Sequence, residues 1–245
     1  MMHFISDKGR KFFEPMRLLM IKGNYDKSLL KTTNIQKIKK ALFLFNIAID
    51  SVLTGSTFSK YMNTNELITY IYNSIKIKKG WLKKKGDFGN SLDYFLALMK
   101  LIYKKEFINF IILNKIIDVN RTLYIPEILK FSYLPELIII EIYDDPSTKI
   151  TNKKSTIFVE FNNNNYEYIL DSICLRDIKK QHVGCFITLN KDDYFFDGDS
   201  KHRIKLEPWN SETLLNKSKI ITFTRESAKF NLMSGYQILY YFRNN

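Results

Sequence analysis

Two residues in the second half of the chain, His182 and Asp197, have side chains suited to proton transfer. His182 directly precedes an apolar segment, Val183–Leu189, and Asp197 directly follows a short aromatic segment, Tyr194–Phe196. Two such runs separated by a polar stretch predict a β-hairpin with its turn at Asn190–Asp193. A hairpin of this kind brings His182 and Asp197 to the same end of adjacent strands. The aspartate can then accept the imidazole Nδ1–H, fix the tautomer and stabilise the imidazolium, as in the base half of a nucleophilic triad. A His and an Asp that flank a hairpin also occur by chance.

Few other residues offer a nucleophile or a metal site. The chain has two cysteines, Cys174 and Cys185. Cys185 follows His182 by three residues on the same expected strand, so its side chain points to the opposite face of the sheet. We therefore expect both cysteines to be small core residues. No CxxC pair, Cys/His cluster or EF-hand spacing is present, and we expect neither a metal nor another cofactor.

The spacing of apolar residues changes along the chain, from helical to strand-like. The first half predicts helices around residues 11–20, 38–52, 67–75 and 91–102. The second half predicts strands at 136–143, 155–161, 166–175, 183–189, 194–196, 204–206 and 236–242. Helices followed by strands indicate a single α+β domain over residues 1–245, with a helical lobe at 1–125 packed against a mostly antiparallel sheet at 126–245.

A strongly basic segment suggests one class of partner. The chain carries a net charge of +13, and its densest run of positive charge surrounds Trp81. Lysines with an interleaved aromatic residue can hold phosphates and stack a base, so nucleic acid is a candidate partner. A solvated basic loop explains the same pattern. The lysines concerned are Lys76, Lys78, Lys79, Lys83, Lys84 and Lys85.

The hydropathy of the chain argues against a membrane protein. No apolar stretch approaches the ~18 residues that a membrane-spanning helix needs. The first residues also lack the apolar core of a signal peptide. We therefore expect an intracellular protein of the cytoplasm or nucleus, without a membrane partner.

Several segments of the chain resemble the ubiquitin-specific protease family, which are ubiquitin carboxyl-terminal hydrolases of papain-like fold. The family's box around its catalytic His has a Y-x-L strand, a loop and then the His before a small residue and an apolar strand. An aromatic block ending in Asp follows, and a final A-Y-x-L-F-Y strand closes the domain. The similar segments, in the family's order, are Gly89–Phe95, Leu134–Ile140, Tyr168–Leu170 with Gln181–Phe186, Asp193–Asp199 and Ser234–Tyr241.

This resemblance implies a papain-like fold with a helical thumb and a sheet palm, with His182 as the base and Asp197 as its orienting residue. The position of the family's nucleophilic Cys falls on His3, and Gln181 and Val183 replace the Gly and Tyr that flank the family's His. The family's zinc-binding fingers are missing as well. A neutral imidazole is a poor substitute for a thiolate in an acyl-enzyme cycle.

The resemblance therefore predicts a catalytically inactive domain that binds ubiquitin, a ubiquitin-like protein or a protein complex as a scaffold. Two alternatives stay open. One is an active cysteine deubiquitinase whose N-terminus is truncated or misannotated, so that the Cys precedes Met1. The other is a basic nucleic-acid-binding protein whose likeness to the protease family is accidental.

Overall fold

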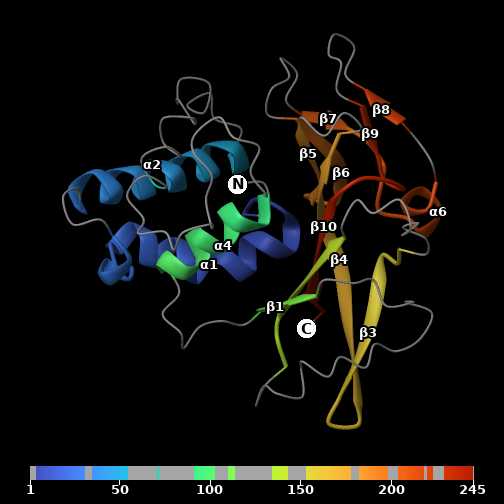
Figure 1. Ribbon diagram of the computed structural model, residues 1–245, viewed down its shortest axis with the longest axis horizontal. Helices are drawn as coiled ribbons and strands as arrows, with labels where there is room; N and C mark the ends of the chain where they lie inside the picture. Colours follow the sequence, from blue (N-terminus) through green and yellow to red (C-terminus); the bar gives the residue numbers. More distant parts are fainter. Residues whose placement is uncertain are drawn as a thin grey trace. The chain divides into compact units, whose positions relative to one another are not determined.

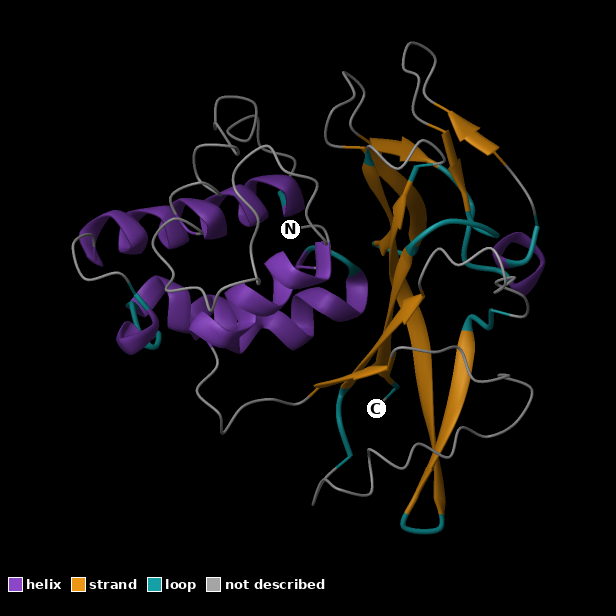
Figure 2. Ribbon diagram, in the orientation of Figure 1, coloured by secondary structure: helices purple, strands orange, loops and turns teal. Residues whose placement is uncertain are grey.

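The structure is a computed structural model. It describes residues 4–30, 35–54, 71, 91–102, 110–113, 134–142, 153–177, 182–197, 204–217, 220–222 and 229–244. The chain divides into two compact units, one made mainly of Arg10–Ile108 and the other of Ser6–Gly9 with Asn109–Asn245. The described elements are helices in the first unit and, except for one short helix, strands in the second (Figure 2). The protein is therefore α+β, as the sequence predicts.

Three of the four helices predicted from apolar spacing lie within the described residues. Helix α1 begins earlier than expected and contains Pro15 in its interior. The predicted helix at 67–75 lies outside the described residues, apart from Ile71, which is helical and buried. The helical elements are α1 (Asp7–Lys22), the 3₁₀ helix η2 (Lys27–Leu29), α2 (Ile35–Leu53) and α4 (Ser91–Ile102).

Aromatic rings pack between the helices of the first unit, α1, α2 and α4. The ring of Phe13 in α1 lies 4.4 Å from that of Phe4 and 5.9 Å from that of Phe95 in α4, measured between centroids. The Phe4 ring meets Phe45 of α2 edge-on at 5.5 Å. All four residues are buried, and such edge-on and stacked contacts stabilise a core beyond the area that they bury.

The second unit is built on an eight-stranded sheet that is antiparallel except for one parallel pair, β1 with β2. Its strands follow the order β1-β2-β10-β4-β5-β6-β7, and β3 pairs with β4 beside this path (Figure 1). The strands are β1 (Phe110–Leu113), β2 (Leu137–Ile142), β3 (Thr156–Phe161), β4 (Asn164–Arg176), β5 (Val183–Leu189), β6 (Asp192–Asp197), β7 (Ile204–Leu206) and β10 (Gln237–Arg243).

All seven strands predicted from the sequence are present, within a few residues of the expected bounds. Among the described residues, three strands and two short helices were not expected: β1, the two-stranded sheet of β8 (Ile220–Thr222) and β9 (Lys229–Asn231), η2, and α6 (Glu212–Leu215). Strand β1 pairs with β2 and belongs to the second unit, which includes Asn109–Asn245.

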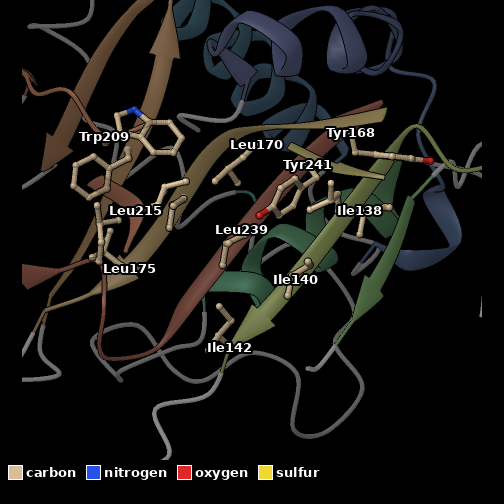
Figure 3. Packing of buried hydrophobic residues seen from close by; sticks show 14 of the residues in the cluster. Ile138, Ile140, Ile142, Tyr168, Leu170, Leu175, Trp209, Leu215, Leu239 and Tyr241 are labelled. Carbon is tan, nitrogen blue, oxygen red and sulfur yellow. The ribbon is translucent and has the colours of Figure 1, made fainter. Parts of the chain in front are cut away.

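The core of the sheet unit lies over β2, β10 and β4. Every residue of β2 is buried, which is typical of a strand covered on both faces. Ile157 and Val159 extend this core onto β3, and Trp209 closes it beside β5. The labelled core residues in Figure 3 are Ile138, Ile140, Ile142, Tyr168, Leu170, Leu175, Trp209, Leu215, Leu239 and Tyr241.

The hairpin of β3 and β4 ends in a tight turn at Asn162 and Asn163, between the two strands predicted at 155–161 and 166–175. Both residues have positive φ, 50° and 61°. Asparagine tolerates this left-handed conformation better than most residues, and the two-residue turn matches the twist of the strands. Among the described residues, no helix is long and apolar enough to cross a membrane.

Candidate functional site

The predicted hairpin that carries His182 and Asp197 is present, with a shorter turn than expected. Strands β5 and β6 are antiparallel, and their turn consists of Asn190 and Lys191 rather than four residues. Both turn residues have positive φ, 53° and 70°. Their backbone N–H groups donate to the two carboxylate oxygens of Asp7, at 2.8 and 2.9 Å. The turn is therefore fixed at its tip by a carboxylate from the start of α1.

The structure brings His182 and Asp197 together. Gly184 pairs with Asp197 across the hairpin, and residues two apart in a strand point to the same face. His182 therefore lies diagonally opposite Asp197, and its Nε2 contacts Asp197 Oδ1. The Asp197 side chain is fully buried, whereas 24% of the His182 side chain is exposed. The pair thus has a buried carboxylate and an imidazole that solvent or a ligand can reach.

The nitrogen that faces the carboxylate is Nε2, so the expectation that Nδ1 would do so is wrong. The diagonal offset of His182 from Asp197 turns the outer end of the ring toward the carboxylate. The consequence for proton transfer is a change of tautomer. When Nε2–H donates to Asp197, Nδ1 of the neutral ring is the proton acceptor. Among the described residues, none hydrogen-bonds to Nδ1.

The backbone of His182 is held by Asp177, which the sequence analysis did not identify. The His182 N–H donates to Asp177 Oδ1 at 2.8 Å, and the Asp177 N–H donates to the His182 carbonyl at 2.8 Å. These two bonds close the connection between β4 and β5 at its base. Asp177 is itself buried. No sequence signal distinguishes it from the other polar residues of this connection.

An aromatic cluster packs beside the His–Asp pair. The His182 ring lies 6.0 Å from the Phe230 ring, and Phe230 lies 4.9 Å from Phe195, measured between ring centroids. Gly184 leaves the space that these rings occupy, because a Cβ at this position would come within 2.4 Å of the Phe195 ring and 3.1 Å of Phe230. A small residue after the His was part of the family resemblance. Here its physical role is to admit two phenyl rings.

The far end of the hairpin is organised by Asp193. Its Oδ1 accepts the Thr188 hydroxyl at 2.9 Å, and its Oδ2 accepts the N–H groups of Trp209 and Asn210 at 3.3 and 3.4 Å. The Trp209 indole N–H donates to the Ile187 carbonyl at 3.2 Å. Asp193 and Trp209 therefore fix the strand positions on which the site depends.

The two cysteines lie on the other face of the sheet from His182. Cys185 pairs with Cys174 on β4 and with Phe196 on β6, so it alternates with Gly184 and Phe186. This confirms the prediction that Cys185 points away from His182. Neither thiol is placed to exchange a proton with the imidazole.

Two buried charged residues of the sheet unit are further candidates for function. Asp171 lies at a bulge in β4, where Tyr240 and Tyr241 of β10 pair with its two neighbours. It accepts the Lys8 N–H at 3.0 Å, and burial raises the pKa of its carboxyl to about 6. Lys153 is 1% exposed; its Nζ donates to the Leu232 carbonyl, and burial lowers its pKa to about 7. A charged residue within an apolar run is the sequence signal for Asp171, which follows Ile169 and Leu170. Lys153 stands in a polar stretch, and no sequence signal identifies it.

The remaining residues predicted from the sequence lie outside the described part of the chain. These are His3, at the position of the missing nucleophile, and the lysines of the basic segment, Lys76, Lys78, Lys79, Lys83, Lys84 and Lys85. Within the described residues, no group of three or more His, Cys, Asp or Glu side chains could hold a metal ion.

Comparison with known proteins identifies no family or relative for this chain. No model of a known protein family matches the chain, and no curated protein matches it significantly. The features that bear on function are the geometry of the His–Asp pair and the arrangement of the strands that carry it.

Proposed function

We propose that this protein is a catalytically silent, ubiquitin-specific-protease-like domain of papain-like fold that binds ubiquitin or a ubiquitin-like protein. The observation that carries the proposal is the contact of His182 Nε2 with Asp197 Oδ1 across the β5–β6 hairpin. The pair has the composition of the base and orienting residue of a cysteine-protease triad. It also retains partial solvent access on the imidazole side.

The arrangement of the resembling segments supports the proposal. Leu134–Ile140 leads into β2, Tyr168–Leu170 lies in β4, and Ser234–Tyr241 leads into β10. Together with β5 and β6, these strands are consecutive neighbours in one sheet, in the order β2-β10-β4-β5-β6. Segments up to about 100 residues apart in the sequence thus converge on the strands that flank the His–Asp pair.

The positions of the two cysteines support a catalytically inactive domain. A cysteine protease needs a thiolate in reach of the imidazole, because the thiolate is the attacking atom. The chain has only two cysteines, and both lie on the face of the sheet away from His182. With His3 at the nucleophile position, the base has no thiol to activate. Binding is the function that such a domain retains.

The test combines binding and hydrolysis on the full chain. ¹⁵N-labelled ubiquitin is titrated with the protein and followed by NMR, and ubiquitin-rhodamine is used as the hydrolysis substrate. We expect ubiquitin resonances to shift on titration, with hydrolysis no faster than in buffer. Val183→Ala serves as the matched control for His182→Ala, because Val183 is an exposed neighbour on the same strand.

Two results would overturn the proposal in different ways. Hydrolysis that is lost in His182→Ala but kept in Val183→Ala would show an active deubiquitinase. Unchanged ubiquitin spectra at millimolar protein, with the same outcome for ubiquitin-like proteins, would remove the proposed partner class.

A further inference from the structure

The two cysteines of the chain lie directly opposite each other on neighbouring strands. Cys174 in β4 is the register partner of Cys185 in β5. Their sulfur atoms are 2.8 Å apart. Neither cysteine is in a disulfide; Cys174 is buried and Cys185 is partly exposed. Because the chain contains no other cysteine, any intramolecular disulfide must join these two residues.

The backbone at this position is compatible with a disulfide. Directly opposed residues of antiparallel strands have Cα atoms about 4.5–5.5 Å apart, which lies within the range of roughly 4.4–6.8 Å seen for disulfides. The sulfur atoms need to approach by about 0.8 Å to reach the S–S bond length of ~2.04 Å. Side-chain rotation supplies a movement of this size without a change of strand register.

We propose that Cys174 and Cys185 form a reversible cross-strand disulfide on exposure to a peroxide, and that low-molecular-weight thiols reduce it again. In the first step the Cys185 sulfur attacks one peroxide oxygen, the O–O bond breaks, and a sulfenic acid and water result. In the second step the Cys174 sulfur attacks the sulfenic sulfur, the S–O bond breaks, and a second water leaves with the Cys174 proton. Two thiols and one hydrogen peroxide thus give one disulfide and two waters, and the two electrons pass from sulfur to the peroxide.

The surroundings of the two thiols set the order of these steps. Cys185 is the more exposed of the two and is the one that a peroxide can reach. The hydrogen bond with Cys185 and burial raise the pKa of the Cys174 thiol. The raised pKa keeps Cys174 protonated, so the first attack on peroxide falls to Cys185. Cys174 is placed to resolve the sulfenic acid because its sulfur lies 2.8 Å from that of Cys185.

The disulfide would act on the candidate site through the chain that connects β4 and β5. The two cysteines are eleven positions apart, and His182 lies within the loop that the bond closes. Closing this loop removes conformational freedom from the unfolded chain and so stabilises the pairing of β4 with β5, the strand that His182 precedes. The inference stands independently of the proposed ubiquitin binding, since it depends only on the thiol geometry.

The test is the intact mass and thermal stability of the full chain after treatment with hydrogen peroxide, followed by dithiothreitol. We expect a mass loss of about 2 Da, with both thiols becoming unreactive toward maleimide and recovering on reduction. The melting temperature should rise by about 5 °C on oxidation and return on reduction. A Cys174→Ala variant should instead gain about 16 Da and react with dimedone at Cys185, as expected for a sulfenic acid without its resolving thiol.

Three outcomes would overturn the proposal. The first is a wild-type chain that gains oxygen without the mass loss of a disulfide. The second is a disulfide that joins two chains, seen as a dimer on a non-reducing gel. The third is a pair of thiols that stays reduced in the folded protein at peroxide levels that oxidise the unfolded chain.

Discussion

Gly184 offers the sharpest test of the packing around the His–Asp pair. It pairs with Asp197 and faces the same side of the sheet as His182. A Cβ built on Gly184 would lie 2.4 Å from Phe195 Cζ, 2.8 Å from Phe195 Cε2 and 3.1 Å from Phe230 Cε1. Phe195 and Phe230 are fully buried, so neither ring can turn into solvent to relieve the contact.

Two effects of opposite sign decide the stability of Gly184→Ala. Replacing glycine by alanine in a strand favours folding by roughly 0.5–1 kcal/mol, because the unfolded chain loses less entropy. Inserting a methyl group into a filled core costs typically 1–3 kcal/mol. Since the contact is below 3 Å to a buried ring, the steric cost wins, and we expect a net loss of about 1–2 kcal/mol in the free energy of unfolding.

Urea unfolding followed by the fluorescence of Trp209 measures this difference. Trp209 is fully buried in the same aromatic cluster, 5.8 Å from the ring of Phe186. A Trp81→Phe background removes the second of the two tryptophans of the chain. Val183→Ala, at a position with 38% exposure, is the matched control and should change stability by no more than ~0.5 kcal/mol.

A smaller ring should rescue the substitution. Phe195→Leu removes the atoms that meet the new methyl group, so the double variant should be more stable than the sum of the two single changes by about 1 kcal/mol or more. If Gly184→Ala is as stable as the wild type, or if the two changes are additive, the close packing of Phe195 and Phe230 against this strand is refuted.

Three further predictions concern the charged residues and the turn. Burial lowers the pKa of Lys153 from 10.5 to about 7, so between these pH values the unfolded chain binds more protons than the folded one, and the free energy of unfolding should rise with pH. Lys153→Met should abolish this rise, as measured by urea titrations at pH 7 and pH 10. An unchanged pH dependence in the variant would contradict the burial of the Lys153 amine. Burial raises the pKa of Asp171 to about 6, so its contribution to stability should be complete below pH ~4 and lost as the pH rises through 6. Asp171→Asn should remove this decline in the free energy of unfolding between pH 4 and 6. A decline that persists in the variant would have to come from another titrating group. Lys191→Gly should stabilise the protein by about 1 kcal/mol, because Lys191 has a φ of 70° in a two-residue hairpin turn and glycine adopts this conformation without strain. A lower melting temperature in the variant would show that the Lys191 side chain stabilises the protein by more than its backbone strain destabilises it.

Much of the sheet and the central pair of the site follow from local sequence patterns. The apolar segment Val183–Leu189 and the polar residues after it indicate a hairpin, and the two-residue period of strands then places His182 and Asp197 near each other. The same period predicts that Cys185 faces away from His182. These properties depend on neighbours in the sequence, so they can be read from the chain alone.

Other features depend on contacts between distant segments. Strand β1 was not predicted because its four residues, Phe110–Leu113, have no strand pattern without their parallel partner β2. The pairing of Cys174 with Cys185 requires the β4–β5 register, which the length of the intervening loop sets. Phe230, which contacts the His182 ring, comes from a strand that is too short to have a recognisable period.

The tautomer shows how a small offset changes the chemistry of a site. Sequence reasoning places the Asp beside the His but does not fix which nitrogen faces it, because that depends on the diagonal offset of one residue pair across the hairpin. The observed contact at Nε2 leaves Nδ1 for any proton transfer.

Asp197 fixes the tautomer of His182, and ring ¹⁵N NMR tests this most directly. In the neutral state, we predict a protonated Nε2 and an unprotonated Nδ1 for His182, assigned by comparison with His182→Gln. Asp197→Ala should remove this preference, whereas Val183→Ala should keep it. An Nδ1–H tautomer in the wild type, or a tautomer ratio that Asp197→Ala does not change, would contradict the account.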